Sequence, residues 1–595
     1  MPISASSAAR RAFAYLRPYR GRMLVGALAL AGANLLGLLQ PWVLRHAVDT
    51  VARWIPGGGL RLAPGSRAAA ALLRDAGWIL ALAAAGGACR FAMRYLMIGV
   101  SRECERDLRA DYFKHLLRLS PAYYQKIRVG DLMSRGTNDL SAVRMLWGPG
   151  VMQSLQTLVT FATGVFLMLR ISPKLTLLAL IPLPLLSVVM ARVGGTIHNR
   201  FEEIQAHLGR MSTKVQENLA GVRVVKAYVR ERDEIAAFER LNAEYVQRNL
   251  RLIRIIGFFY PLFGLLSGAG GAVVLWVGGH EVIAGRLSLG SFVAFNSYLL
   301  MMAWPMMALG WVVNLFQRGT ASMGRIVEVL DVQPDIVDRP GAGRDRPLTG
   351  AIRFERVSFR YSPEGPWVLR DIDLEIPAGR TVAVVGPTGS GKSTLLALLP
   401  RLREASEGRV LLDGQDVREV PLAALRAAFG WVPQDTFLFS ETLRENIRLG
   451  GEDHSAEEAA ERAHLGPDLE TFPKGLETVI GERGITLSGG QKQRTALARA
   501  VARRPRILVL DDAFSAVDTH TEEAILGKLA PFMAGRTTLI VSHRVSTVRG
   551  ADHIVVLDRG RIVEQGGHNE LLARDGLYAG LARRQRLLEE LETEA

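Results

Sequence analysis

The chain has 595 residues, of which 49% are hydrophobic and 22% are charged, and its formal net charge at pH 7 is +15. These averages exclude a disordered chain, and two cysteines, Cys89 and Cys104, are too few for a disulfide scaffold. A balance this basic favours either nucleic acid or the anionic face of a membrane as a partner. The distribution of apolar residues along the chain decides between the two.

The first half of the chain contains six long apolar runs, each near the roughly 20 residues that a helix needs to cross a bilayer. A basic and aromatic segment around Arg10, Phe13 and Tyr19 precedes them and predicts an amphipathic helix on the inner leaflet, not a cleavable signal peptide. The runs cover residues 23–44, 76–100, 151–169, 175–191, 255–277 and 291–316. They predict an all-α transmembrane domain over residues 1–330 and exclude nucleic acid as the partner.

Two long polar segments, residues 101–150 and 192–254, separate the runs and contain few turn signals. Both follow an even-numbered run, so both lie on the side of the N-terminus, which also carries most of the arginines. The positive-inside rule makes that side cytoplasmic. We therefore expect membrane helices that continue into the cytoplasm as long arms, turn and return.

The second half of the chain has the pattern of a nucleotide-binding domain. A linker rich in Pro, Gly and Asp covers residues 331–348, the domain covers 349–585, and a short C-terminal tail covers 586–595. An apolar strand at 381–385 leads directly into the sequence GPTGSGKS, which opens a helix at Thr394. In such a loop the glycines let backbone N–H groups surround phosphates, Lys392 reaches the β- and γ-phosphates, and Ser393 binds Mg²⁺.

Two further motifs belong to the same domain. The buried strand 507–510 ends in Asp511, whose carboxylate can hold the Mg²⁺. The pentapeptide LSGGQ at 487–491 precedes a helical run at 492–503, and bare glycine amides at a helix start form a second anion site. Two phosphate-reading elements in one domain predict that two domains face each other and that each completes the other's site.

The phosphate loop, the LSGGQ pentapeptide, the acidic strand end and His543 after the strand 538–541 together resemble an ATP-binding cassette domain. With six spans before it, the whole chain resembles a half-transporter of the exporter type. The resemblance implies a multidomain protein, an all-α six-span transmembrane domain with cytoplasmic arms followed by an α/β P-loop domain. Residues 131–139 and 205–212, expected at the turns of the two arms, resemble the short coupling helices that dock on such a domain; solvated charged turns are the alternative.

The resemblance also assigns roles within the nucleotide site, with ATP and Mg²⁺ as its ligands. Tyr361 matches the aromatic residue that stacks on adenine, although a strand aromatic in the core is the alternative. Gln434 matches the glutamine that touches Mg²⁺ or the attacking water. His543 matches the histidine that senses the γ-phosphate. The phosphate loop comprises Gly386, Pro387, Thr388, Gly389, Ser390, Gly391, Lys392, Ser393 and Thr394; the signature that acts on the partner's ATP comprises Leu487, Ser488, Gly489, Gly490 and Gln491; the loop between the two sites runs from Ser515 to Asp518.

One position departs from the family pattern. The residue after Asp511 is normally a glutamate that orients or deprotonates the attacking water, and here it is Asp512. A side chain shorter by one methylene withdraws the carboxylate by roughly 1 Å, and a displacement of that size costs about a hundredfold in rate. The site therefore resembles the weak site of a heterodimeric exporter, whose partner chain carries the glutamate; a homodimeric lipid flippase with two equal sites is the alternative.

The transported substrate is the least determined part of the sequence. Arg90 and Arg94 share one face of the second run and would receive an anionic headgroup or an acidic peptide, snorkel toward the inner leaflet, or pair within the bundle. Tyr298, Trp304 and Trp311 belong to an aromatic and methionine-rich cluster suited to an apolar cavity; the alternative is that half of the cluster faces lipid or neighbouring helices. Drugs, lipids and peptides all remain possible substrates for a multi-pass protein of the cytoplasmic (inner) membrane. A soluble chromosome-maintenance ATPase is excluded by the six runs.

Overall fold

The computed structural model describes residues 5–53, 67–340, 343, 348–451, 456–481 and 487–594. The chain divides into two compact units, one formed by Met1–Leu117 with Val129–Val332 and the other by Arg118–Arg128 with Gln333–Ala595. Each unit is described by itself below. Part of the predicted linker, residues 341–342 and 344–347, lies outside the described residues.

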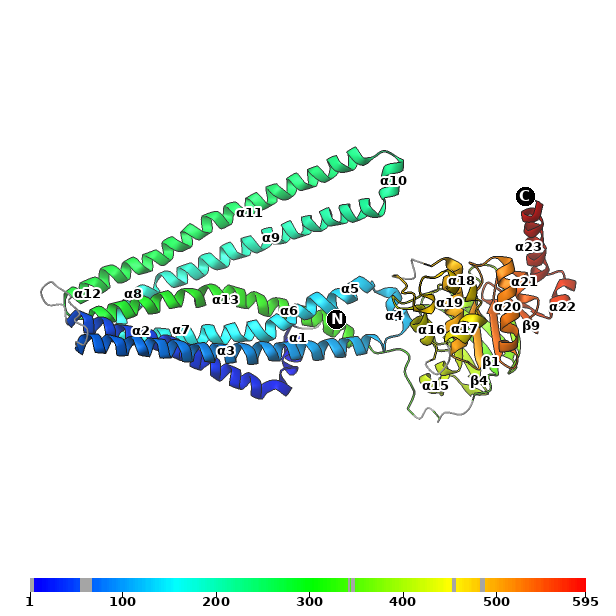
Figure 1. Cartoon of the computed structure of the whole chain (residues 1–595), viewed down its shortest axis with the longest axis horizontal. Helices are drawn as coiled ribbons and strands as arrows, with labels where there is room; N and C mark the ends of the chain where they lie inside the picture. The colour runs from blue at the N-terminus through cyan, green and yellow to red at the C-terminus, as the bar shows by residue number, and fades with distance from the viewer. Residues whose placement is uncertain are drawn as a thin grey trace. The chain divides into compact units, whose positions relative to one another are not determined.

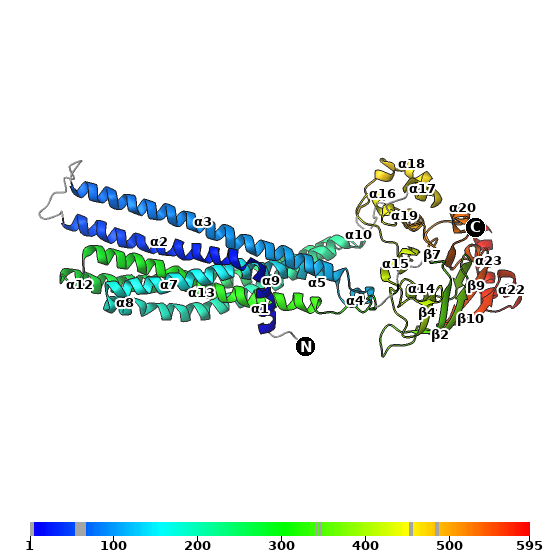
Figure 2. The ribbon, with the colours of Figure 1, turned by 90° about the horizontal axis from the view of Figure 1, so that it is seen from below.

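In its described residues the first unit contains helices joined by short turns and no strand (Figures 1 and 2). It contains the short helices α1 (Ala5–Ala14) and α5 (Val129–Ser134), α6 (Leu140–Met145), α8 (Pro173–Leu180), α10 (Val222–Ala227) and α12 (Gly279–Ile283). Its long helices are α2 (Arg20–Arg53), α3 (Arg67–Leu116), α7 (Val151–Ile171), α9 (Pro182–Ala220), α11 (Glu231–Val273) and α13 (Leu289–Leu330). One short 3₁₀ turn, η1 (Arg17–Tyr19), and three π-helical turns, η2 (Arg135–Asp139), η3 (Leu146–Gly150) and η4 (Val274–Gly278), connect them.

Among the described residues, three helical stretches are long and apolar enough to cross a membrane. They are Arg17–Arg53, Ala69–Leu116 and Val129–Ile171, and a shorter apolar helix covers Leu289–Met302. The predicted count of six spans stays a prediction. The helix breaks between the third and fourth runs at Ser172, which is extended, accepts a hydrogen bond from the Leu175 N–H at 3.3 Å and precedes Pro173 at the first turn of α8.

Helices α2 and α3 lie side by side along their lengths (Figures 1 and 2). They approach closely at Gly26, where an added Cβ would come within 2.6 Å of the Met97 side chain. Leu30, Met93 and Met97 form a buried cluster in this contact. Helices α9 and α11 form a second pair, and Figure 1 shows the hairpin that they make with α10 at its tip leaving the other helices of this unit.

The predicted coupling segments were misplaced. The chain turns after α3 at α4 (Pro121–Lys126), and residues 131–139 come after that turn, in α5 and η2. It turns again at Gly221 and α10, whereas residues 205–212 lie inside the continuous helix α9. Polar residues such as Glu, Gln and Arg are good helix formers on an exposed arm, so charge alone did not mark a turn. The signals that do mark the turns are Pro121 and Gly221.

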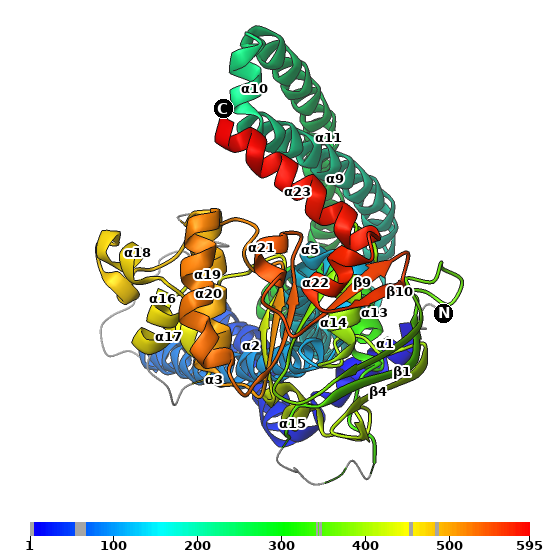
Figure 3. The same ribbon diagram turned by 90° about the vertical axis from the view of Figure 1, so that its right-hand side faces the viewer.

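The second unit contains two β-sheets with helices around them (Figure 3). A four-stranded antiparallel sheet has the order β2 (Leu369–Ile376), β1 (Ile352–Phe359), β4 (Glu407–Leu412) and β5 (Gln415–Asp416). A six-stranded sheet has the order β10 (Arg561–Gly566), β9 (His553–Asp558), β3 (Thr381–Val385), β8 (Thr537–Val541), β7 (Ile507–Asp511) and β6 (Phe429–Val432). Only β10 is antiparallel in the second sheet.

The helices of this unit follow the α/β pattern expected from the sequence. They are α4, α14 (Lys392–Leu398), α15 (Leu422–Ala427), α16 (Leu443–Arg448), α17 (Ala456–Arg462), α18 (Gly466–Thr471), α19 (Gly489–Ala502), α20 (Thr519–Met533), α21 (Val545–Val548), α22 (His568–Ala573) and α23 (Leu577–Glu594), with a 3₁₀ turn η5 (Gly475–Glu477). In Figure 3, α16 to α20 gather on one side of this unit and β1 and β4 on the other. Every residue of β7 and β8 is buried, as expected of central parallel strands.

Two boundaries can be compared with the sequence. Helix α13 ends at Leu330 and β1 begins at Ile352, which leaves room for the predicted linker. The predicted tail is not a separate segment, because α23 runs through residue 586 without a break.

Helix α4 packs with the second unit: Gln125 accepts a hydrogen bond from Arg403, and the Ser120 hydroxyl donates to Asp335 at 3.2 Å.

Candidate nucleotide-binding site

A pocket of about 300 Å³ opens in the second unit where the parallel strands β3, β7 and β8 end. Ligand sites of open α/β sheets form at this edge because loops from several strands meet there. Thirteen residues line it: Tyr361, Val368, Thr388, Gly389, Gly391, Lys392, Ser393, Thr394, Gln434, Asp511, Asp512, Val541 and His543. The structure thus brings together residues from six separate parts of the sequence, eleven of which were predicted as site residues.

The loop after β3 has a backbone that only glycine fits at two positions. Gly386 has φ +150°, and a Cβ there would lie 2.0 Å from the Leu557 carbonyl oxygen. Gly391 has φ +104°, and a Cβ there would lie 3.0 Å from the Val368 carbonyl oxygen. The motif therefore requires glycine for its fold as well as for the approach of phosphate to its N–H groups.

Lys392 is held inside this loop. Its Nζ donates to the carbonyl oxygens of Gly386 and Pro387, both at 2.9 Å, and its side chain is buried. Burial lowers the pKa of Lys392, and the charges of Asp511 and Asp512 oppose that shift. The cation is fixed by backbone atoms at the place where the phosphates of a nucleotide would bind.

Ser393 and Asp511 form the second part of the pocket. The Ser393 hydroxyl donates to Asp511 Oδ1 at 3.1 Å, and Asp511 is buried at the end of β7. Burial raises the pKa of Asp511 above its ordinary value and the charge of Asp512 adds to this, while the Ser393 hydrogen bond and Lys392 oppose it. A hydroxyl, a carboxylate and the nearby Gln434 amide oxygen are hard oxygen donors, and this donor set fits Mg²⁺.

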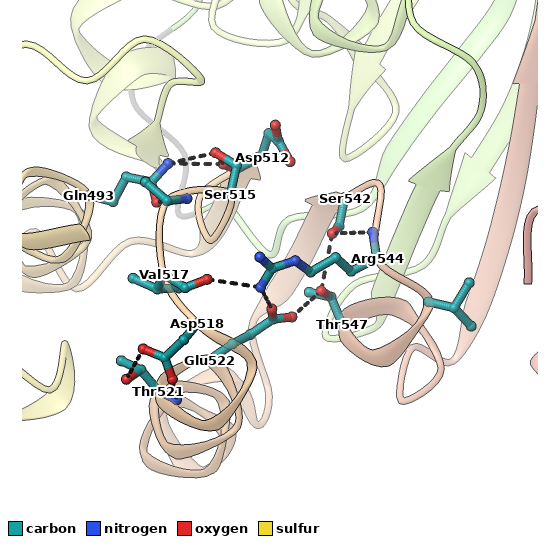
Figure 4. A network of polar contacts seen from close by, with 12 residues as sticks. Gln493, Asp512, Ser515, Val517, Asp518, Thr521, Glu522, Ser542, Arg544 and Thr547 are labelled. Carbon is teal, nitrogen blue, oxygen red and sulfur yellow. Dashed lines mark hydrogen bonds and ion pairs between the residues drawn. The ribbon is translucent and has the colours of Figure 1, made fainter. Parts of the chain in front are cut away.

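Asp512 enters the pocket from a strained backbone. Its φ is +50°, in the left-handed region that aspartate tolerates better than most residues. Its N–H donates to the Val541 carbonyl at 2.9 Å, and its own carbonyl accepts the Ser515 hydroxyl at 3.1 Å (Figure 4). These bonds fix the main chain on both sides, so the reach of the carboxylate depends on the length of the side chain.

Tyr361 lies at the rim of the pocket. Its hydroxyl and the Thr394 hydroxyl are 2.8 Å apart, its ring meets Phe359 edge-on at 5.1 Å, and the Arg403 guanidinium lies 5.2 Å from the ring centre. The residue is 52% exposed, which excludes the alternative of a core aromatic. An exposed aromatic face beside a phosphate loop can stack on a base.

The signature residues lie outside this pocket, at the start of α19. Ser488 is the N-cap of the helix, and its hydroxyl and the Gln491 side chain form a capping box with bonds of 3.2 and 2.9 Å. Gly490 packs against the inter-site loop, since an added Cβ would lie 3.0 Å from Val517 Cγ1. Asp518 ends that loop as the N-cap of α20, accepting the Thr521 N–H at 2.8 Å. Leu487 and Gly489 occupy the same helix start.

A polar network that the sequence motifs did not predict lies behind these loops (Figure 4). Arg544, next to His543, donates to the Val517 carbonyl at 3.0 Å and to Glu522 at 2.6 Å. Glu522 is 1% exposed and also accepts the Thr547 hydroxyl. Gln493 of α19 donates to the Ser515 hydroxyl at 2.8 Å.

The network connects the loop of His543, the inter-site loop and the signature helix. In the sequence, the one sign of this network is Glu522 near the start of a helix. The residue pattern does not show that Glu522 is buried. Glu522, Arg544 and Gln493 therefore support the site without lining it.

Comparison with known proteins follows the same division of the chain. Residues 23–306 match the model of the ABC transporter transmembrane region, and residues 369–515 match the ABC transporter model. A probable multidrug resistance ABC transporter ATP-binding/permease protein, YheI of Bacillus subtilis (strain 168), is 39% identical over 578 residues, which are 96% of this chain and 97% of that protein. The chain belongs to the ABC transporter family.

Other ABC transporters are similar over most of the chain. The ATP-dependent lipid A-core flippase of Syntrophus aciditrophicus (strain SB) is 37% identical over 83% of this chain and 82% of its own length. The multidrug resistance-like ATP-binding protein MdlA of Escherichia coli (strain K12) is 35% identical over 84% and 85%. The structure of a bacterial Atm1-family ABC exporter with ATP bound matches with a TM-score of 0.78 at 29% identity, covering 96% of this chain and 99% of that one.

These similarities establish an ATPase-coupled exporter of the half-transporter type. One chain carries one transmembrane region and one ATP-binding domain, in the order predicted from the motifs. The family and the two kinds of domain are confirmed, and ABC exporters of this type dimerise. The roles of individual site residues stay predictions.

The predicted substrate residues of this ABC transporter separate in the structure. Arg90 and Arg94 line one groove on α3. Trp304 and Trp311, both on α13, are 59% and 46% exposed. Tyr298 was expected at a cavity but is fully buried, with its hydroxyl donating to the Leu38 carbonyl at 2.8 Å. That bond satisfies its only polar group within the helix packing, so Tyr298 supports the bundle.

Proposed function

We propose that this chain exports amphipathic or hydrophobic molecules across the cytoplasmic membrane as one half of a heterodimer. Its own phosphate-loop site binds ATP and hydrolyses it slowly, and its intact LSGGQ signature completes a competent site on a partner chain that carries a glutamate at the position of Asp512. The observation that carries this proposal is Asp512 in the wall of the pocket, on a main chain that hydrogen bonds hold from both sides.

Each group of pocket residues has its own role in the proposed reaction. The glycine-rich loop and Lys392 bind the phosphates, and Tyr361 stacks on the base. Ser393, Asp511 and Gln434 would hold Mg²⁺, which supplies charge stabilisation to the phosphates when it is bound. Asp512 orients the attacking water and His543 contacts the γ-phosphate.

Because the side chain of Asp512 is short, it positions the attacking water poorly, and the hydrolysis step is slow. A loss of roughly 1 Å in reach costs about a hundredfold in rate, while binding by the loop is unaffected. Two nucleotides close the two ATP-binding domains on each other, the arms transmit closure to the membrane helices, and hydrolysis at the competent site resets the transporter. The N-terminus and the ATP-binding domain face the cytoplasm in this proposal.

The substrate class is supported only by relatives. The relatives named above include multidrug resistance proteins and a lipid A-core flippase, and drugs, lipids and peptides are therefore all candidates for this chain. A homodimeric lipid flippase is the second candidate function. The similarity to the lipid A-core flippase favours this second candidate, whereas aspartate instead of glutamate at position 512 is evidence against it.

The deciding experiment is purification of the tagged chain from its native membranes and identification of what accompanies it. A different half-transporter in equal amount, with glutamate at the position of Asp512, is the expected result. Recovery of this chain alone as a dimer would contradict the heterodimer. The homodimeric flippase would then become the better proposal, with Asp512 responsible for hydrolysis at both sites.

A further inference from the structure

A groove of about 740 Å³ runs along one face of α3 beside the start of α2. Its α3 residues lie within the matched transmembrane region. Its lining residues fall on one face of α3 at helical spacing, with one contribution from α2: Arg22, Gly87, Arg90, Phe91, Arg94, Tyr95, Ile98, Gly99, Arg102 and Glu103. The groove is deep at Gly87 and Gly99, because glycine has no side chain to fill it. No atom outside the helix lies within 4 Å of a Cβ built at Gly87, and at Gly99 the nearest is the Arg22 guanidinium at 3.8 Å.

Some charged side chains in this groove have ion-pair partners in the described part of the chain and others do not. Arg22 donates to Glu103 at 2.8 Å and Arg102 donates to Glu105 at 3.1 Å. In the part of the chain that the structure describes, neither Arg90 nor Arg94 takes part in an ion pair or hydrogen bond. The groove therefore holds two guanidinium groups whose five donors each have no partner among the described residues.

The two unpaired arginines lie deeper along α3 than the paired ones. Arg94 and Arg90 precede Glu103 by nine and thirteen residues, which corresponds to about 14 and 20 Å along the helix axis. The Arg22–Glu103 pair stands where the first apolar run begins, at the level of the membrane surface. A hydrocarbon half-layer is about 15 Å thick, so a charge at Arg90 or Arg94 must either find an anion or reach back to the surface.

Two aromatic rings stand beside these arginines. Phe91 and Tyr95 are 72% and 68% exposed, and their rings are stacked with centres 6.1 Å apart and planes 15° from parallel. The groove thus offers an apolar wall along the same stretch as an unpaired cationic pair. This combination matches a molecule with an anionic phosphate head and an apolar chain, because guanidinium binds phosphate in two-point geometry and the rings cover acyl carbons.

We infer that this groove binds the headgroup of an anionic phospholipid, with Arg90 and Arg94 on the phosphate and the Phe91–Tyr95 pair along the acyl chain. The inference does not depend on the proposed hydrolysis at the Asp512 site. It concerns a ligand in the membrane region and is tested without nucleotide.

The test is native mass spectrometry of the full-length protein in detergent, titrated with phosphatidylglycerol and, separately, with phosphatidylcholine. The expected result is a preference of about thirtyfold for phosphatidylglycerol, because roughly 1 kcal/mol for each of two basic residues near an anionic lipid sums to about 2 kcal/mol. Arg90→Gln with Arg94→Gln should abolish this preference. Arg90→Lys with Arg94→Lys, which keeps both charges but not the two-point geometry, should retain part of it.

A matched control comes from another helix of the same unit. Arg251→Gln with Arg254→Gln removes two exposed arginines of α11 that do not line the groove and should leave the preference intact. Equal binding of the two lipids to the unaltered protein would overturn the inference, and so would a preference that survives the Arg90/Arg94 glutamine change. Competition by glycerophosphoglycerol, which has the headgroup without acyl chains, at the same concentration would also overturn it, because the site would then bind a soluble anion.

Discussion

At the scale of single residues, Asp512 is the position where this chain differs most informatively from the family pattern. Its main chain is fixed by the Val541 carbonyl and the Ser515 hydroxyl, so lengthening the side chain changes the reach of the carboxylate and little else. Asp512→Glu should raise the rate of ATP hydrolysis at this site by about 10- to 100-fold, since the lost reach is restored. The measurement is phosphate release by the purified transporter under saturating ATP.

Asp512→Asn is the matched control for that change, because it keeps the size and removes the charge. It should lower hydrolysis at this site further and leave nucleotide affinity nearly unchanged. An unchanged or lower rate in Asp512→Glu would show that side-chain reach does not limit the site.

Asp413 gives a second prediction at residue scale, on stability. Its carboxylate accepts the N–H groups of Thr349, Gly350 and Ala351 at 2.7 to 3.0 Å, at the entry to β1. Burial opposes ionisation of Asp413, but the hydrogen bond from the Thr349 hydroxyl and those from the three N–H groups outweigh it and hold the pKa of Asp413 below the ordinary value. The stabilisation is therefore complete above the pKa of the unfolded chain and is lost as the pH falls through the lower pKa of the folded protein.

Asp413→Asn should lower the free energy of unfolding by about 1 kcal/mol at pH 7, the usual contribution of such a bond. The melting temperatures of the two proteins, followed from pH 8 downward, should differ by a constant amount until the carboxyl range and then converge. A difference that grows on acidification would contradict the sign of this assignment.

At the scale of secondary-structure elements, the Glu522–Arg544 pair connects α20 to the loop of His543 (Figure 4). Glu522 is 1% exposed while Arg544 is partly open to solvent, so removing the carboxylate leaves a half-buried cation without its partner. We expect Glu522→Ala to cost about 2 kcal/mol of stability, below the range for a fully buried pair. Hydrolysis should fall as well, because Arg544, which also donates to the Val517 carbonyl of the inter-site loop, loses the carboxylate that orients it.

Thermal denaturation and ATPase measurements on the same samples would separate these two effects. Thr547→Val, which removes the hydroxyl bonded to Glu522 and keeps the ion pair, is the milder comparison and should lower both quantities less. Full hydrolysis in a destabilised Glu522→Ala protein would limit the network to a structural role.

At the scale of the whole molecule, α4 is the segment that joins the two functions of the chain. It continues from α3 of the first unit, yet it packs with the second unit through Ser120 with Asp335 and through Gln125 with Arg403. Arg403 in turn lies over the Tyr361 ring at the rim of the nucleotide pocket. Occupancy of the pocket can therefore reach α4 through two side chains.

Ser120→Ala with Gln125→Ala should weaken the stimulation of ATP hydrolysis by transported substrate while basal hydrolysis stays intact. The reason is that both residues contact the ATP-binding domain without lining its pocket. The measurement is ATPase activity with and without a transported drug or lipid in reconstituted vesicles. Undiminished stimulation would show that coupling follows another route, such as α10.

The sequence by itself determined the family, the order of the two domains and most of the nucleotide pocket. This was possible because a phosphate loop, an acidic strand end and a signature pentapeptide are local motifs, whose residues must stand at fixed spacing whatever surrounds them. Helix α9 shows where that reasoning stopped: charged residues at 205–212 indicated a turn, but on an exposed arm they extend a helix that Gly221 ends.

Only the tertiary structure decided which side chains are buried and which charges are paired. Tyr298 and Glu522 became structural because segments far apart in the chain close over them, and no local pattern carries that information. Arg22 of α2 finds Glu103 across the α2–α3 contact, whereas Arg90 and Arg94 have no carboxylate within reach among the described residues. Pairing depends on distances between elements, which the fold sets and the order of residues does not.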